Sequence, residues 1–361
     1  MFKFNDLNSI HLEITSRCQA KCPMCSRNYR SGIENPNLKL ADWTIDEFKN
    51  IITIDVLSQI NNIYFCGNFG DPIINDHLLE MCRYIKDVNP NFGVRIHTNG
   101  GARKTDWWKE LRSCLPENHI VIFGIDGLED THHLYRVGTT YDTVIRNAKA
   151  FISAGGKAEW VFIKFKHNEH QVIEAETRAR TYGFKNFTVK HSTRFMELKF
   201  DVLDQEGNLK YYLEPPSDNE VVLINSDIIE KFKSWVNESE INCYVKQNKE
   251  IYIDAHKKLF PCCFLASTPY NYIHPGSIIE SVKTTIRDQY DNLVNDLGGI
   301  SMLDLNNRSI RDIIDSDIWQ NIWNKYWQDP KLITCARTCG NNKNENISKP
   351  KDQFIKRINF D

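Results

Sequence analysis

Residues 9–25 read SIHLEITSRCQAKCPMC, a short β-rich run followed at once by three cysteines. The run alternates apolar and polar residues as a half-buried strand does. The cysteines are Cys18, Cys22 and Cys25, in the spacing CxxxCxxC. Three thiolates on one short loop can hold three irons of a cubane iron-sulfur cluster and leave the fourth iron open. A closed structural metal site needs a fourth protein ligand, and no fourth cysteine follows locally.

Beyond this stretch, β-rich runs alternate with amphipathic helical patterns along the first half of the chain. Six strand-like runs end at Thr15, Gly67, Thr98, Ile125, Phe165 and His191. One helix is predicted to begin at Thr44, where the sequence TIDE indicates a capping box. Alternating strands and helices build a parallel sheet, and six such units predict an α/β fold with a partial (β/α)6 TIM-like barrel. The loops that follow the strands then meet at one face, where active sites are built.

The alternation stops near residue 195, and the chain changes character beyond a polar stretch that holds Pro215 and Pro216. We interpret this stretch as a linker. After it come a short helix, the hairpin-like run KEIYIDAHKKLFPC and further helices. The predicted parts are the barrel at 1–194, the linker at 195–225, a small α+β domain at 226–345 and a C-terminal tail at 346–361.

Composition narrows the class of protein. The chain has 361 residues, of which 41% are apolar and 25% charged, with 11 cysteines and a formal net charge of −2. Such a balance leaves no bulk positive charge for binding nucleic acid. The opening residues lack the apolar core of a signal peptide, and no run reaches the ~18 apolar residues of a membrane span. We therefore expect a soluble cytoplasmic protein without nucleic-acid or membrane partners, whose reduced cysteines serve metal binding or catalysis.

The three-cysteine loop after the first strand of a βα-repeat chain resembles the radical S-adenosylmethionine (SAM) superfamily. In that family the three cysteines ligate a 4Fe-4S cluster, and SAM chelates the fourth iron. Reductive cleavage of SAM then gives a 5′-deoxyadenosyl radical, which abstracts a hydrogen atom from the substrate. The resemblance implies that Cys18, Cys22 and Cys25 are the catalytic cluster ligands. It also implies an electron donor such as flavodoxin or ferredoxin.

Other strand ends carry segments that fit the same resemblance. Residues 67–72, GNFGDP, are similar to the family's Gly-Gly-Glu-Pro segment, whose backbone approaches the SAM amine, with Asp71 in the acidic place. The resemblance implies SAM contacts by Gly67, Asn68, Gly70, Asp71, Asn99, Asp126, Arg136 and Asn168. Ordinary turn or helix-cap chemistry is the alternative for Asn99, Arg136 and Asn168. The sequence departs from the family at Met24, where an aromatic residue is common, and within the glycine segment itself.

A second set of cysteines occupies the last third of the chain, at Cys243, Cys262, Cys263, Cys335 and Cys339. Two distant pairs can converge into one four-thiolate site. The region resembles the twitch or SPASM extension of radical SAM enzymes, and its cysteine count implies one auxiliary 4Fe-4S cluster. The ligands would be Cys243, Cys335, Cys339 and one of Cys262 and Cys263, with Cys262 the better match. A four-cysteine zinc site is the alternative.

Strand alternation indicates what the barrel would offer a substrate. His11 and Glu13 share the polar face of the first strand, and His97 lies on that of the third. On the fifth strand the more polar face carries Trp160 and Lys164. If these faces point inward, the lumen holds charges of both signs and suits a polar substrate.

We therefore predict a radical SAM oxidoreductase or peptide-modifying enzyme. By the resemblance, a peptide or protein side chain is the first substrate class. Dehydrogenation or epimerisation of a small polar molecule, such as an aminocyclitol or a sugar, is the alternative. The alternative outside enzymes is a scaffold protein with two zinc-binding modules.

Overall fold

The central element of the fold is a nine-stranded sheet, in the order β12-β11-β1-β4-β5-β6-β7-β8-β13. It is seen in a computed structural model that describes residues 1–195, 197–218, 234–271, 280–329, 331–341 and 354–360. The six predicted strands are confirmed as β1 (Ser9–Leu12), β4 (Asn62–Phe65), β5 (Gly93–Thr98), β6 (His119–Gly124), β7 (Ala158–Lys164) and β8 (Asn186–His191). Each pairs in parallel with the next. The α/β class and the partial barrel are thus as predicted.

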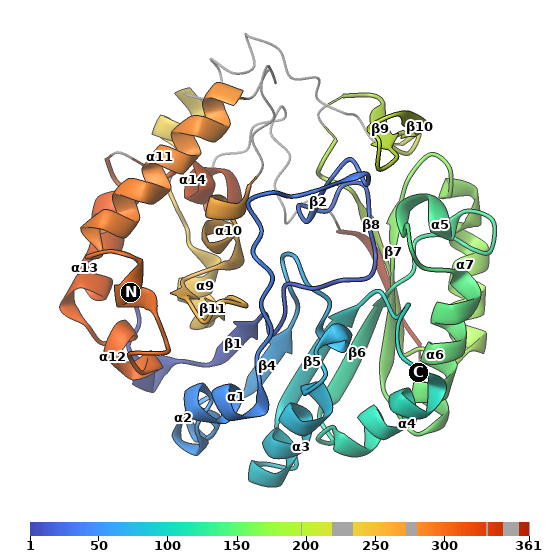
Figure 1. The fold of residues 1–361 in the computed structure, drawn as a ribbon, viewed down its shortest axis with the longest axis horizontal. Helices are drawn as coiled ribbons and strands as arrows, with labels where there is room; N and C mark the ends of the chain where they lie inside the picture. The colour runs from blue at the N-terminus through green and yellow to red at the C-terminus, as the bar shows by residue number, and fades with distance from the viewer. Residues whose placement is uncertain (196, 219–233, 272–279, 330, 342–353, 361) are drawn as a thin grey trace.

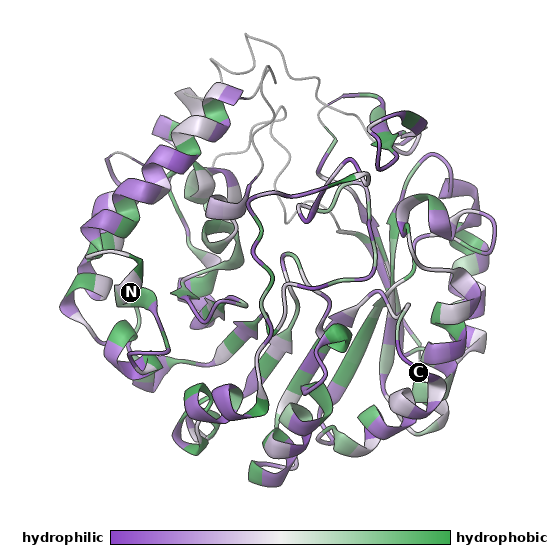
Figure 2. Cartoon of the chain, viewed as in Figure 1, coloured by the Kyte–Doolittle hydropathy of each residue, from purple (hydrophilic) through white to green (hydrophobic). Residues whose placement is uncertain are grey.

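Helices cover the outer side of this curved sheet (Figure 1). They are α1 (Ile45–Ile51), α2 (Ile54–Gln59), α3 (Leu78–Val88), α4 (Thr105–Cys114), α5 (His132–Tyr135), α6 (Tyr141–Ser153) and α7 (Val172–Thr181). The capping box predicted at Thr44 is present, since Thr44 and Glu47 each bind the other's backbone amide. Apolar residues concentrate on the central strands (Figure 2), and fully buried aromatic side chains such as Trp108 and Phe123 fill the layer between sheet and helices.

The sheet is wider than the six predicted strands. The predicted hairpin forms as β11 (Glu250–Ile253) and β12 (Leu259–Phe260), and β11 runs parallel to β1. At the other edge β13 (Phe354–Asn359), in the predicted tail, pairs antiparallel with β8. The C-terminal part therefore extends the barrel sheet at both edges, which a local sequence pattern cannot reveal because the paired segments are distant in the chain.

Part of the predicted linker is a β-hairpin made of β9 (Phe200–Leu203) and β10 (Leu209–Leu213). Val202 and Leu213 pack with Met24, so the hairpin contacts the three-cysteine loop. The short hairpin β2 (Asn28–Tyr29) and β3 (Ile33–Glu34) follows that loop directly. Residues 219–225 of the linker, and most of the helix predicted just after them, lie outside the described residues.

The remaining helices lie beside β1 and β11 (Figure 1). They are α9 (Tyr244–Asn248), α10 (Cys263–Ala266), α11 (Glu280–Asp296), α12 (Ile310–Ile314), α13 (Asp317–Tyr326) and α14 (Ile333–Cys339). Short 3-10 turns occur at Phe4–Asp6, Pro72–Ile74, Glu169–Gln171, Thr268–Tyr270 and Ile300–Leu303. In the described part of the chain, no helix combines the length and the apolar composition that crossing a membrane would need.

The prediction for the inward face of the fifth strand was wrong. Trp160 is fully buried on the helix side, where its ring packs against Tyr141 of α6, and its Nε1 donates to the Ile125 carbonyl at 2.8 Å. Glu159 instead lies on the inner face with Arg95, and its Oε2 is 3.9 Å from Arg95 Nη2. The free energy gained by burying the Trp160 indole in the apolar layer decides which face of β7 points outward. Lys164 lies at the strand end and has less influence on that choice.

Candidate functional site

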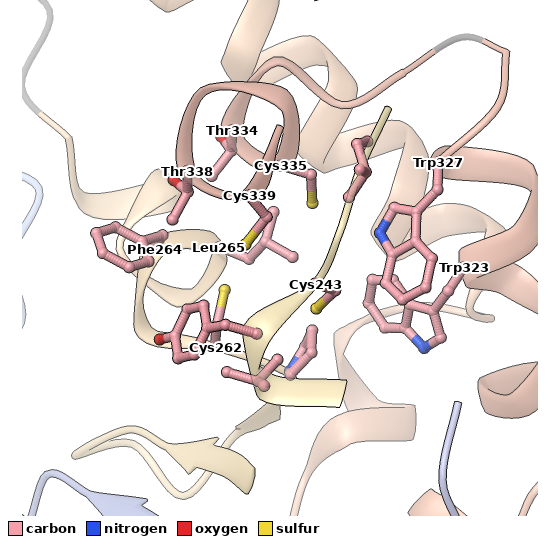
Figure 3. A pocket seen from close by; sticks show the side chains of 14 residues that line it. Cys243, Cys262, Phe264, Leu265, Trp323, Trp327, Thr334, Cys335, Thr338 and Cys339 are labelled. Atoms are coloured by element: carbon pink, nitrogen blue, oxygen red, sulfur yellow. The ribbon is translucent and has the colours of Figure 1, made fainter. Parts of the chain in front are cut away.

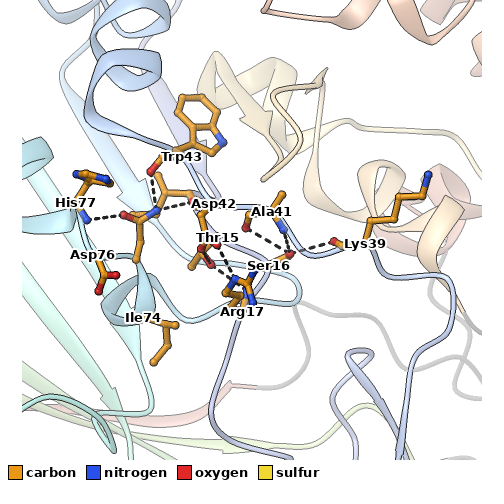
Figure 4. A network of polar contacts seen from close by, with 12 residues as sticks. Thr15, Ser16, Arg17, Lys39, Ala41, Asp42, Trp43, Ile74, Asp76 and His77 are labelled. Atoms are coloured by element: carbon orange, nitrogen blue, oxygen red, sulfur yellow. Dashed lines mark hydrogen bonds and ion pairs between the residues drawn. The ribbon is translucent and has the colours of Figure 1, made fainter.

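The three cysteines lie on the loop that leaves the C-terminal end of β1, and the segment before them is fixed by polar contacts (Figure 4). Thr15 Oγ1 donates to Asp42 Oδ1, and Arg17 Nε donates to Asp42 Oδ2, both at 2.6 Å. On the other side the buried Asn75 amide donates to the Ile14 carbonyl at 2.9 Å. The start of the loop therefore has little freedom to move.

The thiols of this loop face two donors, one directly after β5 and one just after α5 in the connection that follows β6. Asn99 Nδ2 donates to Cys18 Sγ at 3.5 Å, and Arg136 Nη1 donates to Cys22 Sγ at 3.9 Å. Cys25 closes the turn, with its amide donating to the Cys22 carbonyl at 3.0 Å. These donors would stabilise the negative charge that thiolates bring to an iron-sulfur cluster.

Without metal, the thiols of Cys18 and Cys22 keep their protons near neutral pH. Burial raises the pKa of Cys22 to about 11, although the Arg136 guanidinium opposes the shift, and burial also raises the pKa of Cys18. Metal binding would therefore release protons here. Among the described residues, no three His, Cys, Asp or Glu side chains meet closely enough to share one metal ion. In a cubane cluster each thiolate binds its own iron, so the fit of this loop rests on the three adjacent thiols and their two donors.

Asp71 and Asn99, both predicted to contact SAM, bind each other. Asp71 Oδ2 accepts from the Asn99 backbone amide at 2.7 Å and from its side-chain amide at 2.6 Å. Asn99 Oδ1 in turn accepts from Gln19 Nε2 at 2.7 Å. Burial raises the pKa of Asp71, and these hydrogen bonds oppose the rise. The arrangement orients the Asn99 amide toward Cys18.

Asp126 and Arg136 form a second buried pair. Asp126 is fully buried, and its Oδ2 accepts from Arg136 Nε at 2.6 Å, while Oδ1 accepts from the Ile163 amide at 2.5 Å. A Cβ added to Gly124 would lie 2.3 Å from Arg136 Nη2, so only glycine lets the guanidinium lie against β6. The pair thus holds a positive charge beside Cys22.

The two predicted loop glycines are required by close approach of the backbone. A Cβ at Gly70 would lie 1.8 Å from the Thr15 carbonyl oxygen, and one at Gly67 would lie 2.6 Å from Glu13 Oε1. The side chain of Asn68, between them, donates to the Cys263 carbonyl at 2.9 Å. The loop is therefore tied to β1 on one side and to the C-terminal half on the other.

Asn168 binds backbone groups of the loop after β7. Its Oδ1 accepts from the Phe165 amide at 2.7 Å, and its Nδ2 donates to the carbonyls of Ile163 at 3.0 Å and Asp126 at 3.2 Å. These bonds fit the alternative of turn capping, and a SAM contact by Asn168 stays a prediction.

The second set of cysteines meets in one cavity, with four sulfur atoms directed into it (Figure 3). These are the thiols of Cys243, Cys262, Cys335 and Cys339. Cys335 and Cys339 are four residues apart on α14, so they share one helix face. Of the two adjacent cysteines, Cys262 lines this cavity and Cys263 does not, and the assignment of Cys262 as a ligand stays a prediction.

Apolar side chains form much of the cavity wall, including Trp323 and Trp327. Burial raises the pKa of Cys262 to about 12 and that of Cys335 well above its usual range. A hydrogen bond with Cys339, together with burial, raises the pKa of Cys243. Four thiols around an apolar cavity are a donor set for a cluster, in which each thiolate binds its own iron, and its binding would release the protons held by Cys243, Cys262 and Cys335.

The inner face of the sheet carries a row of polar rings. His11 packs against Tyr64 with ring centroids 4.8 Å apart, and Tyr64 packs against His97 at 4.9 Å. Burial lowers the pKa of His11 to about 4 and that of His97 well below its usual range. Both imidazoles are therefore neutral near pH 7, and the inner face offers hydrogen-bonding groups rather than extra cations.

Comparison with known proteins bears on the first of these two sites. Residues 12–163 match the family model of the radical SAM superfamily. The chain carries a radical SAM domain. That domain contains the three-cysteine loop and every predicted SAM contact except Asn168, and the family implies a 4Fe-4S cluster and SAM as cofactors. The four-cysteine cavity lies outside the matched residues.

Individual relatives of the radical SAM domain are distant. The chain is 28% identical over 130 residues to the tungsten-containing aldehyde ferredoxin oxidoreductase cofactor-modifying protein of Pyrococcus furiosus, a match that covers 36% of this chain. The match spans only 33% of that relative's length. SuiB of Streptococcus suis bound to SAM is 14% identical, with 72% of this chain and 61% of that chain covered and a TM-score of 0.45. The SAM-bound anSMEcpe is 14% identical, with 87% and 82% covered and a TM-score of 0.48.

Sequence reasoning did not identify two residues that act near the radical SAM site. Gln19 lies between the cluster cysteines and binds Asn99, and no spacing rule singles it out. Tyr252 of β11 donates to the Glu13 carboxylate. Only the pairing of β11 with β1 brings Tyr252 there, and that pairing is a tertiary feature.

Proposed function

We propose that this protein is a radical SAM enzyme with one auxiliary 4Fe-4S cluster, acting on a peptide or protein side chain. The observation that carries the proposal is the presence of two separate thiol sets. One lies on the loop after β1 beside the Asn99 and Arg136 donors, and the other lines the four-cysteine cavity.

The first set suits a cluster with an open corner. Cys18, Cys22 and Cys25 would bind three irons and leave the fourth for SAM, and the backbone of residues 67–71 would receive the SAM amine. When loaded, the cluster supplies the electron that cleaves SAM and so starts hydrogen abstraction. The protein's own contribution is to fix the loop and to place the Arg136 charge and the Asn99 amide at the thiolates.

The second set of cysteines suits a cluster in which every iron has a protein ligand. Four protein thiolates would occupy all four irons, which favours electron transfer over direct substrate binding. Accepting an electron from a substrate radical is the role that this ligand count supports. Zinc is the alternative occupant, because four cysteines are a common zinc ligand set, but the described thiols would have to move closer together to share one ion.

The inner face of the sheet and the resemblance both support the proposed substrate class. His11, Tyr64, His97 and Lys190 give that face polar groups, which supports a polar substrate. The twitch or SPASM resemblance favours a peptide or protein side chain over a small molecule such as an aminocyclitol. An external reductant such as flavodoxin or ferredoxin would supply electrons.

Metal analysis of anaerobically purified protein tests the two-cluster proposal. We expect about eight irons per chain, from two cubane clusters. Replacing Cys18, Cys22 and Cys25 with Ala should leave about four irons at the auxiliary site. Colourless protein with stoichiometric zinc would overturn the proposal and favour the scaffold alternative.

A further inference from the structure

One carboxylate holds the backbone of the glycine loop at residues 67–71. Glu13 Oε1 accepts hydrogen bonds from the amides of Phe69 and Gly70, each at 2.9 Å. The Glu13 side chain is 2% exposed, so the loop closes over it. Because both amides bind the same oxygen, the loop conformation depends on where that carboxylate lies.

The other oxygen of this carboxylate is bound from the C-terminal half of the chain. Tyr252 Oη donates to Glu13 Oε2. Tyr252 stands opposite His11 in the parallel β11–β1 pair, and its ring packs edge-on against the imidazole, with centroids 4.8 Å apart. Burial raises the pKa of Tyr252 well above its usual range, so the phenol keeps its proton and acts as a fixed donor.

A second contact ties the loop to the same hydroxyl. Asn68 Nδ2 donates to Tyr252 Oη at 3.3 Å and to the Cys263 carbonyl at 2.9 Å. The Tyr252 hydroxyl thus donates to Glu13 and accepts from Asn68, so it acts as both donor and acceptor, and Tyr252 itself is only 1% exposed. Removing this hydroxyl would leave buried polar groups without their partner.

We propose that Tyr252 is a positioning residue for SAM binding. It fixes the Glu13 carboxylate, which fixes the amides of Phe69 and Gly70 and hence the backbone that faces SAM. This inference rests on the proposed function, in which the loop receives the SAM amine. The SAM site is then built by both halves of the chain, with the loop from the barrel and its support from β11.

Tyr252→Phe tests the proposal because it removes one hydroxyl and keeps the ring that packs on His11. In the cluster-loaded protein we expect the dissociation constant for SAM to rise about tenfold, the size of effect typical of a lost hydrogen bond to a charged group. The turnover at saturating SAM should change little, since the hydroxyl does not touch reacting atoms. Hydrogen exchange at Phe69 and Gly70, measured without SAM, should accelerate about tenfold.

The matched control is Tyr290→Phe. Tyr290 of α11 is also buried, and its ring packs against Phe260 rather than against the glycine loop. This variant should leave SAM affinity and loop exchange as in the wild type. The double variant Tyr252→Phe with Glu13→Gln should weaken SAM binding by less than the two single effects combined, because Tyr252 acts largely through Glu13 and only its contact with Asn68 is independent of that carboxylate.

These experiments distinguish failure of the proposed function from failure of the positioning role of Tyr252. If the wild type does not bind SAM, the proposed function fails, whatever the exchange data show. If the wild type binds SAM but Tyr252→Phe retains its affinity and its slow exchange at Phe69 and Gly70, the positioning role is overturned. Faster exchange together with weaker SAM binding, absent from Tyr290→Phe, supports it.

Discussion

Arg136 Nη1 lies 3.9 Å from Cys22 Sγ, and the same guanidinium is held by Asp126 through a 2.6 Å contact at Nε. A buried ion pair therefore places a positive charge at one thiol of the cluster loop. The arrangement is costly to break on one side only, because the remaining charge would stay buried without a partner.

Replacing Arg136 with Gln should lower the free energy of unfolding by about 3 kcal/mol, the typical cost of leaving a buried charge unpaired. Denaturant unfolding measures this loss. The double variant Arg136→Gln with Asp126→Asn should recover part of it, since no buried charge then remains. A double variant less stable than Arg136→Gln would contradict the ion-pair account.

The two adjacent cysteines at the start of α10 should behave differently. Cys262 lines the four-thiol cavity and Cys263 does not. Cys262→Ala should therefore lower the iron content by about four per chain, while Cys263→Ala, the matched control, should keep it. Metal analysis of the two anaerobic preparations decides the matter, and equal iron content in both would refute the ligand assignment.

Gly70→Ala should abolish SAM binding. The added Cβ would lie 1.8 Å from the Thr15 carbonyl oxygen, so the loop backbone must move. Gly207→Ala is the control, because no atom lies within 4 Å of its added Cβ and only its positive φ is strained. Equilibrium binding of SAM to both variants checks the prediction, and tight binding by Gly70→Ala would show that the loop can shift at no cost.

Asp254 should make the fold less stable as the pH rises. Burial raises its pKa to about 7, and it accepts hydrogen bonds from the amides of His256 and Lys258. In the unfolded chain the Asp254 carboxyl ionises near the ordinary Asp pKa of about 4. Between about pH 4 and pH 7 the folded state therefore holds the proton that the unfolded state loses, so stability falls with pH and levels off above about 7.

Unfolding free energies of wild type and Asp254→Asn at pH 5 and pH 8 test this sign. The Asn side chain keeps an acceptor for the two amides but cannot ionise. The wild type should lose stability relative to Asp254→Asn between these two values. A wild type that gains stability relative to the variant would contradict the assignment.

Local patterns predicted most of the barrel but not its edges. Each central strand and the Thr44 capping box could be inferred, because alternation and capping are properties of neighbouring residues. The pairing of β11 with β1 could not, since it joins segments far apart in the chain. The prediction of which face of β7 points inward was wrong. It gave more weight to the polar residue at the strand end than to the aromatic residue of β7 that packs under α6.

In the candidate site, too, local patterns predicted some features and missed those that depend on tertiary contacts. Cysteine spacing indicated both thiol sets, and the cavity contains four of the cysteines expected there. The sequence did not show which hydrogen-bond partners orient these thiols. Asp71 binds Asn99 and Asn168 binds loop backbone, and the SAM contacts of both residues stay predictions. Only the folded backbone shows which polar groups are already satisfied.

The measurement that tests the central claim most directly is release of 5′-deoxyadenosine from SAM by the anaerobic, reduced protein. The wild type should release it in the presence of a strong one-electron reductant, and so should Cys262→Ala, which alters only the auxiliary site. The variant with Cys18, Cys22 and Cys25 replaced by Ala should release none. Release by that triple variant at the wild-type rate, or none from iron-loaded wild type, would contradict the assignment of the radical SAM site.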